Sequence, residues 1–112
     1  MSANIPMAFH VTTRWGRDEP DPTLARLREI LTQLDADDPE HPSVSLTHET
    51  EWSLGAYPCG LLVWENLEAG EPRHMNGVSR ERVLELWVQL SHGRIADIEA
   101  EPWLPGSEDL PS

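Results

Sequence analysis

Apolar residues recur every three or four positions in two segments of the chain, and this spacing predicts two amphipathic helices. The first helix is expected to begin at Pro22 or Thr23 with Asp21 as its cap, and its apolar stripe comprises Leu24, Leu27, Ile30, Leu31 and Leu34. The second helix follows a capping Ser79 and ends at Gly93; its stripe comprises Val83, Leu84, Trp87 and Leu90, with Leu86 on one flank. Each stripe covers one side of its helix, so both helices need an apolar surface to pack on.

Shorter segments carry the patterns of β-strands that can supply this surface. Residues 8–15 are rich in β-branched and aromatic side chains, and residues 43–48 and 51–57 alternate between apolar and polar. Residues 61–66 are apolar on both faces, which is typical of a central strand, and residues 73–77 can form a short last strand. The predicted fold is α+β: an antiparallel sheet of four to five strands, in the order β-α-β-β-β-(β)-α, with two helices packed on one face.

The turn at Pro58–Gly60 leaves the register of the sheet open. A two-residue loop, Pro58 and Cys59, would pair Leu54 with Val63, whereas a three-residue loop ending at Gly60 would pair Leu54 with Trp64. A slip of one residue moves every side chain of a strand to the opposite face. The sequence therefore allows Trp64 either in the core or on the surface.

The 112 residues are expected to form one domain, 1–112, with flexible ends at 1–7 and 106–112. No segment approaches the roughly 18–20 apolar residues that cross a bilayer. The first ten residues lack the basic and then apolar pattern of a secretory signal, and the lone Cys59 has no internal partner for a disulfide. These features predict a cytoplasmic protein.

Charge is the strongest global feature of the chain. The formal net charge is −12, and all eight basic residues are arginine. Between Glu29 and Pro72 there are ten acidic residues and no arginine, and five more acidic residues follow Ile95 without a base. Such a field repels nucleic acid and anionic membranes and attracts basic surfaces.

The sequence offers no pattern of residues typical of a catalytic or metal site. The five histidines lack zinc-ligand spacing, and the acidic segment 35–41 lacks the glycine and the distal glutamate of a calcium loop. Isolated glycines cannot form a phosphate-binding loop. The chain is therefore expected not to be an enzyme and to need no metal or cofactor.

The segment "ERVLELWVQLSHGRIADIEAEPWLPG", which follows a short tryptophan-containing meander, resembles small immunity proteins of bacterial polymorphic-toxin systems. The resemblance covers roughly residues 43–105. The lysine-free composition, rich in Arg, Ala and Pro, indicates a high-GC bacterial source. The resemblance implies a protein that binds and neutralises a cognate toxin by blocking a basic active-site cleft with an acidic surface. We expect this protein to be a monomer.

The expected partner-binding residues come from the loop after the first helix and from the turns of the meander, with one tryptophan as an apolar anchor if it is exposed. They are Asp35, Asp37, Asp38, Glu40, Glu49, Glu51, Trp64, Glu65, Glu68 and Glu71. The alternative function is a small acidic secretion chaperone, a homodimer that holds an effector segment along a sheet edge. The first hypothesis requires the carboxylates to gather on one surface.

Overall fold

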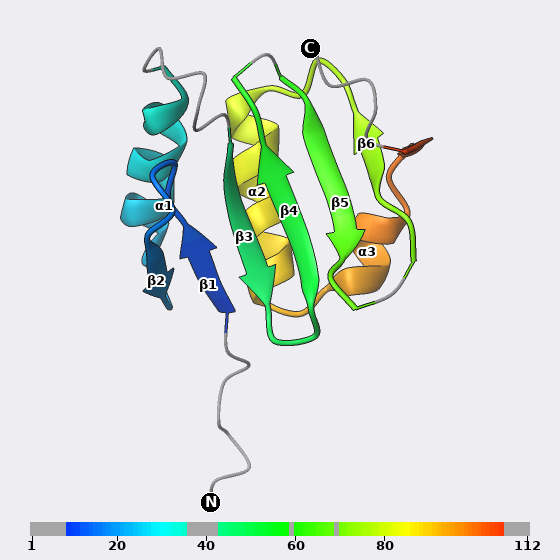
Figure 1. Cartoon of the computed structure of the whole chain (residues 1–112), viewed down its shortest axis with the longest axis horizontal. Helices are drawn as coiled ribbons and strands as arrows, with labels where there is room; N and C mark the ends of the chain where they lie inside the picture. Colours follow the sequence, from blue (N-terminus) through cyan, green and yellow to red (C-terminus); the bar gives the residue numbers. More distant parts are fainter. Residues whose placement is uncertain (1–8, 36–42, 59, 69, 107–112) are drawn as a thin grey trace, which may run out of the picture.

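A seven-stranded antiparallel sheet forms one layer of the protein, and helices cover one of its faces (Figure 1). The computed structural model describes residues 9–35, 43–58, 60–68 and 70–106. The strand order is β2-β1-β3-β4-β5-β6-β7. The strands are β1 (Phe9–Thr12), β2 (Asp18–Pro20), β3 (Val44–His48), β4 (Trp52–Ala56), β5 (Leu62–Asn66), β6 (Arg73–Met75) and β7 (Leu104–Pro105), and the helices are α1 (Leu24–Thr32), the 3-10 helix η2 (Gln33–Asp35), α2 (Arg80–Ser91) and α3 (Ile95–Glu99).

The predicted α+β class and the antiparallel meander are confirmed, but the expectation of four to five strands is wrong. The two additional strands are the edge strands β2 and β7, which have three and two residues. Both are mostly exposed and contain a proline, so they carry no alternating hydrophobic pattern. They are recognisable only by their backbone pairing with β1 and β6.

The two long helices match their predicted apolar stripes closely. Ser79 caps α2 by accepting a hydrogen bond from the Arg82 N–H (3.1 Å), and Gly93 follows the helix with φ +75°. In α1 the cap is Thr23 rather than the predicted Asp21, whose N–H instead extends the pairing of β1 and β2. Leu24 is also displaced from the expected stripe, because its side chain is 49% exposed.

The structure resolves the register of β4 and β5 in favour of the three-residue loop. Leu54 pairs with Trp64, and the Tyr57 N–H donates to the Leu61 carbonyl oxygen (3.0 Å) across the loop. Gly60 adopts φ +87°, and a Cβ at this position would lie 3.3 Å from the Gly77 Cα. Trp64 therefore points to the helix-covered face, where Leu54 also lies.

Trp64 is fully buried and belongs to a stack of three indoles. Its ring centroid lies 4.4 Å from that of Trp52 and 6.0 Å from that of Trp103, with nearly parallel planes. The Trp64 Nε1–H donates to Glu99 (2.9 Å), and the Trp103 Nε1–H donates to the Ile98 carbonyl oxygen (2.8 Å). The stack ties the segment after α3 to the sheet, and burial excludes Trp64 as a surface anchor.

The remaining core lies between the sheet and the helices. Trp87 of α2 is fully buried and donates from Nε1 to the Leu54 carbonyl oxygen (3.1 Å), while Leu86, expected on a flank, is buried as well. Gly106, expected in a flexible end, pairs through its N–H with the Pro72 carbonyl oxygen (2.9 Å). Residues 1–7, also expected to be flexible, and 107–112 lie outside the described part of the chain. No helix among the described residues is long and apolar enough to span a membrane.

Candidate functional site

Five of the predicted carboxylates lie at one end of the sheet, which we call the acidic end. The β3–β4 turn carries Glu49 and Glu51, while the end of β5 and the β5–β6 connection carry Glu65, Glu68 and Glu71. Successive strands of a meander run in opposite directions, so the connections alternate between the two ends of the sheet. The β3–β4 and β5–β6 connections therefore share an end (Figure 1).

Hydrogen bonds join the two connections of the acidic end into one surface. The Leu67 N–H donates to the Glu51 carbonyl oxygen (2.8 Å), and the Asn66 side-chain amide donates to the Thr50 carbonyl oxygen (3.3 Å). Leu67 is 55% exposed beside these carboxylates. Leu67 therefore offers the exposed apolar contact that was expected of Trp64. The hydrophobic periodicity of the sequence does not single out Leu67.

Glu51 occupies a backbone conformation that L-residues rarely adopt. Its φ is +75°, in the left-handed region where glycine is preferred and a side chain costs roughly 1 kcal/mol. The Glu51 N–H closes the turn by donating to the His48 carbonyl oxygen (2.8 Å). Strained non-glycine residues concentrate at functional sites, so a glutamate here favours a role for its carboxylate.

Six of the eight arginines form ion pairs with other carboxylates among the described residues. Their partners are distributed over the helices, β2 and the segment after α3: Arg26 with Glu19 and Glu29, Arg28 with Glu81, Arg73 with Glu99, Arg80 with Asp35, Arg82 with Glu85 and Glu101, and Arg94 with Asp97. Within the described part of the chain, Glu51, Glu65, Glu68 and Glu71 form no ion pair with an arginine. Negative charge is therefore least compensated at the acidic end.

The pKa shifts follow this division of the carboxylates. Two hydrogen bonds from Arg26 (2.8 and 2.6 Å) hold the pKa of Glu19 below its usual 4.5. Burial alone would raise the pKa of Glu99, but hydrogen bonds from Arg73 and Trp64 outweigh it and lower that pKa. These carboxylates are occupied by their own cations and are poor candidates for binding a partner.

The expectation that all of the predicted partner-binding carboxylates gather on one surface is wrong for Asp35. This residue follows α1 and pairs with Arg80 at the start of α2 (3.1 Å), beside the β4–β5 end of the sheet rather than the acidic end. A strand the length of β4 separates the two ends, roughly 15 Å at 3.3 Å per residue. Asp37, Asp38 and Glu40 lie outside the described residues.

The sheet face opposite the helices, which we call the open face, adjoins the acidic end (Figure 1). Two rows of cross-strand neighbours cover its centre: His10, Thr47, Ser53 and Glu65 in one, and Thr12, Ser45, Gly55 and Val63 in the other. A hollow of about 330 Å³ lies over Gly55 on this face. Its lining is rich in hydroxyl groups and includes Glu65 and Leu67 of the acidic end.

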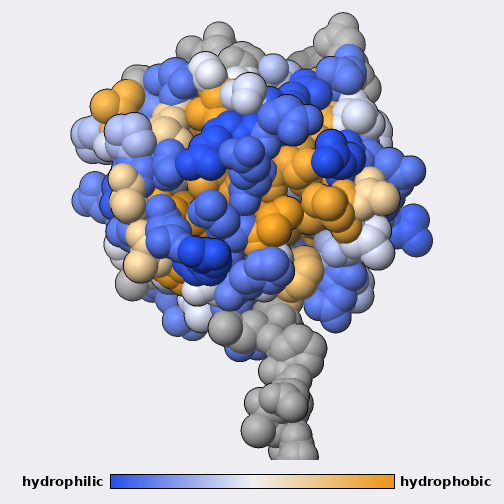
Figure 2. Space-filling model, turned by 180° about the vertical axis from the view of Figure 1, so that it is seen from behind, coloured by the Kyte–Doolittle hydropathy of each residue, from blue (hydrophilic) through white to orange (hydrophobic). Residues whose placement is uncertain are grey.

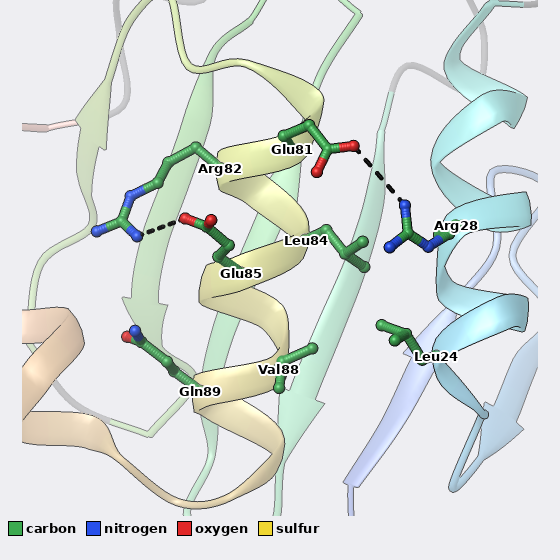
Figure 3. Close-up of a pocket in the computed structure, with 8 residues that line it drawn as sticks. All are labelled: Leu24, Arg28, Glu81, Arg82, Leu84, Glu85, Val88 and Gln89. Atoms are coloured by element: carbon green, nitrogen blue, oxygen red, sulfur yellow. Dashed lines mark hydrogen bonds and ion pairs between the residues drawn. The ribbon is translucent and has the colours of Figure 1, made fainter.

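The helix side of the molecule carries a second concavity, a groove of about 450 Å³ between α1 and α2. Apolar side chains gather between polar ones on this side (Figure 2). Leu24, Leu84 and Val88 face the groove, and an ion pair between Arg28 and Glu81 (3.7 Å) crosses from one helix to the other (Figure 3). The charges lining the groove pair with each other, so it lacks convergent polar groups for a ligand.

Histidines and carboxylates are the side chains that could bind a metal ion or act as bases in this protein. In the described ranges, no three His, Cys, Asp or Glu side chains lie close enough together to hold a metal ion. His48 and His74 are buried, and His74 donates from Nδ1 to the Gly106 carbonyl oxygen (2.6 Å). The described residues that line the groove between α1 and α2 include no hydroxyl or thiol group, and in the hollow on the open face the Thr12 hydroxyl donates to Asp18 (2.8 Å).

Comparison with known proteins gives no relative: the chain matches no protein-family model, no curated protein and no solved structure.

Proposed function

We propose that this protein is a cytoplasmic immunity protein, which binds a basic toxin domain and blocks its active-site cleft. The observation that carries the proposal is which carboxylates form ion pairs with arginines and which do not. Six of the eight arginines pair with other carboxylates, and among the described residues Glu51, Glu65, Glu68 and Glu71 have no such pair at one end of the sheet. Uncompensated like charges destabilise a folded protein, so their retention favours a cationic partner.

The contact surface comprises the acidic end and the adjoining open face. Leu67 supplies exposed apolar area beside the carboxylates, and Glu51 is held in a strained turn. A basic cleft that binds phosphate groups would meet complementary charge on this surface, and electrostatic steering would accelerate the encounter. The protein acts in this proposal by occupying the cleft, without catalysis of its own.

The alternative, a secretion chaperone that holds an effector along a sheet edge, has less support. Strand addition needs a long exposed edge with free backbone groups. Here the edge strands are short, and each includes a proline, Pro20 in β2 and Pro105 in β7, which cannot donate a backbone hydrogen bond.

The test is binding to the toxin domain encoded beside the gene, measured by stopped-flow at 50 and 300 mM NaCl. We expect the association rate constant to fall at least about tenfold over this range because steering is screened by salt. Replacing Glu51 and Glu68 by Gln should lower the rate at 50 mM NaCl by several-fold. The matched control is Asp35→Asn with Glu81→Gln, which removes two carboxylates paired with Arg80 and Arg28 beside the N-terminus of α2, toward the opposite end of the sheet. A salt-independent rate, or equal effects of the two sets, would contradict the proposal.

A further inference from the structure

The hollow on the open face exists because a central strand carries a glycine where its neighbours carry side chains. Gly55 pairs with Ser45 of β3 on one side and with Val63 of β5 on the other. Cross-strand neighbours lie about 4.5–5.5 Å apart, so an absent side chain leaves room for a group from outside. Ser53 and Tyr57 flank Gly55 on the same face, two residues away along the chain.

The fold itself does not require glycine at this position. Gly55 is not among the residues with positive φ. A Cβ built on it would meet Ser45 Cβ and the Val44 carbonyl oxygen at 3.9 Å, which is ordinary van der Waals contact. Glycine in a strand interior costs roughly 0.5–1 kcal/mol relative to alanine and often marks close approach of a ligand or another chain. The glycine is therefore better explained by a group from outside the chain that occupies the hollow.

The lining of the hollow favours a cation. Glu65 lies diagonally across from Gly55, and Ser45 adds a hydroxyl oxygen. Ser53 is hydrogen-bonded to Thr47 (3.0 Å), and Asp18, at the far side, accepts from Thr12 (2.8 Å). None of the described residues lining the hollow is an arginine. The Tyr57 ring adds an aromatic surface to the same lining. An aromatic ring together with a carboxylate and hydroxyl acceptors matches a planar guanidinium, which stacks on rings and donates five hydrogen bonds.

We infer that the hollow over Gly55 receives an arginine side chain of the protein partner, with Glu65 as its counter-ion. This inference rests on the proposed function for the basic character of the partner. It adds a specific contact to that function: the acidic end attracts the partner, and the hollow fixes one of its arginines. The commitment to one arginine follows from the single side-chain position that Gly55 leaves empty between Ser45 and Val63.

The inference can be tested without the partner, using Nα-acetyl-arginine amide as the probe. It is titrated into the 15N-labelled full chain at constant ionic strength, and amide chemical shifts are followed. We expect saturable shifts at Ser45, Gly55 and Val63, with an apparent Kd in the millimolar range. The neutral analogue Nα-acetyl-citrulline amide, which has nearly the same shape, should cause shifts at least about tenfold weaker because it lacks the charge.

Two variants locate the binding site. Gly55→Thr fills the hollow with a residue that favours strands, and Glu65→Gln removes the counter-ion without changing its shape. Each should raise the apparent Kd at least about tenfold. The matched control, Glu68→Gln, removes a carboxylate of the acidic end that does not line the hollow and should stay within about twofold.

The inference is overturned if the shifts spread over all acidic residues, if the citrulline analogue binds equally, or if Gly55→Thr binds as the unaltered protein does. The same variant separates this failure from that of the proposed function. If Gly55→Thr still binds the basic toxin domain fully while the Glu51 and Glu68 variant does not, the acidic end stands as the contact surface and the hollow does not.

Discussion

At the scale of single residues, His48 is the polar side chain most affected by burial. It is 1% exposed, and its Nδ1 accepts a hydrogen bond from the Thr50 N–H (3.2 Å), so the neutral ring carries its proton on Nε2. Nε2 is buried and, among the described atoms, has no hydrogen-bond partner. Burial lowers the pKa of His48 below its usual 6.5, and the nearby Glu49 offsets this only in part.

This histidine predicts how stability depends on pH. Because the pKa is lower in the folded state, the unfolded chain binds the proton first as the pH falls below about 6.5. The free energy of unfolding should then fall by at most about 1.4 kcal/mol per pH unit, until the folded-state pKa is passed. Above pH 6.5 this contribution is constant.

The measurement is urea unfolding at pH 7.5, 6.5 and 5.5 for the unaltered chain and for His48→Asn. Asparagine can still accept from the Thr50 N–H, but it fills less of the space that the imidazole ring occupies. We therefore expect His48→Asn to lower the free energy of unfolding by about 2 kcal/mol at pH 7.5 and to make it depend less on pH. The control is the exposed His92→Asn, which should keep the original slope. Equal slopes for His48→Asn and the unaltered chain would show that His48 does not titrate differently on folding.

At the scale of elements, α3 and the segment after it depend on one carboxylate. Glu99 accepts hydrogen bonds from Arg73 (2.6 Å) and from Nε1 of Trp64 (2.9 Å), whose ring stacks with those of Trp52 and Trp103. Its lowered pKa means that the charged form stabilises the fold above about pH 4.5, and that this contribution is lost as the pH falls through the folded-state pKa.

Glu99→Gln should therefore destabilise the protein by about 1 kcal/mol at pH 7, because a charge-assisted pair becomes a neutral hydrogen bond. The difference should shrink as the pH falls through the lowered pKa of Glu99, since the carboxylate itself is then protonated. Tryptophan fluorescence during urea unfolding reports both effects. Asp97→Asn is the matched control in the same helix, because its pair with Arg94 is half exposed and contributes little. Equal losses in the two variants would contradict the assigned role of Glu99.

The elements that the sequence predicted are those with a strong hydrophobic period. The stripe of α2, the alternation in β3 and β4 and the apolar β5 appear as expected, and so does the stripe of α1 apart from the exposed Leu24. The edge strands β2 and β7 were missed because pairing with a neighbour, rather than side-chain burial, defines them. The register was left open because two loop lengths fit the sequence, and the packing of Trp64 under α3 decides it.

The candidate site was predictable to a similar extent. An antiparallel meander places alternate turns at the same end, so Glu49 and Glu51 could be expected near Glu68. The sequence could not reveal that Arg80 compensates Asp35, because 45 residues separate them and only the packing of α1 against α2 brings them together. Counting charges along the chain therefore overestimates the number of carboxylates that have no arginine partner.

At the scale of the whole molecule, the carboxylates behind the formal net charge of −12 do not all affect stability in the same way. Carboxylates paired with arginines contribute attraction, whereas Glu51, Glu65, Glu68 and Glu71 contribute mainly repulsion among themselves and toward the rest of the acidic field. If the acidic end is retained for binding, it should cost stability in the free protein.

Replacing these four glutamates by Gln should thus raise the free energy of unfolding by roughly 1–2 kcal/mol at 10 mM salt. The gain should fall by more than half at 0.5 M NaCl, where the Debye length is only about 4 Å. The matched control removes four paired carboxylates, through Glu19→Gln, Asp35→Asn, Glu99→Gln and Glu101→Gln, with the same change in net charge. The control should be destabilised instead, because each substitution breaks an ion pair. Similar effects of the two sets would mean that net charge alone governs stability, and that the acidic end has no special cost for which a partner must account.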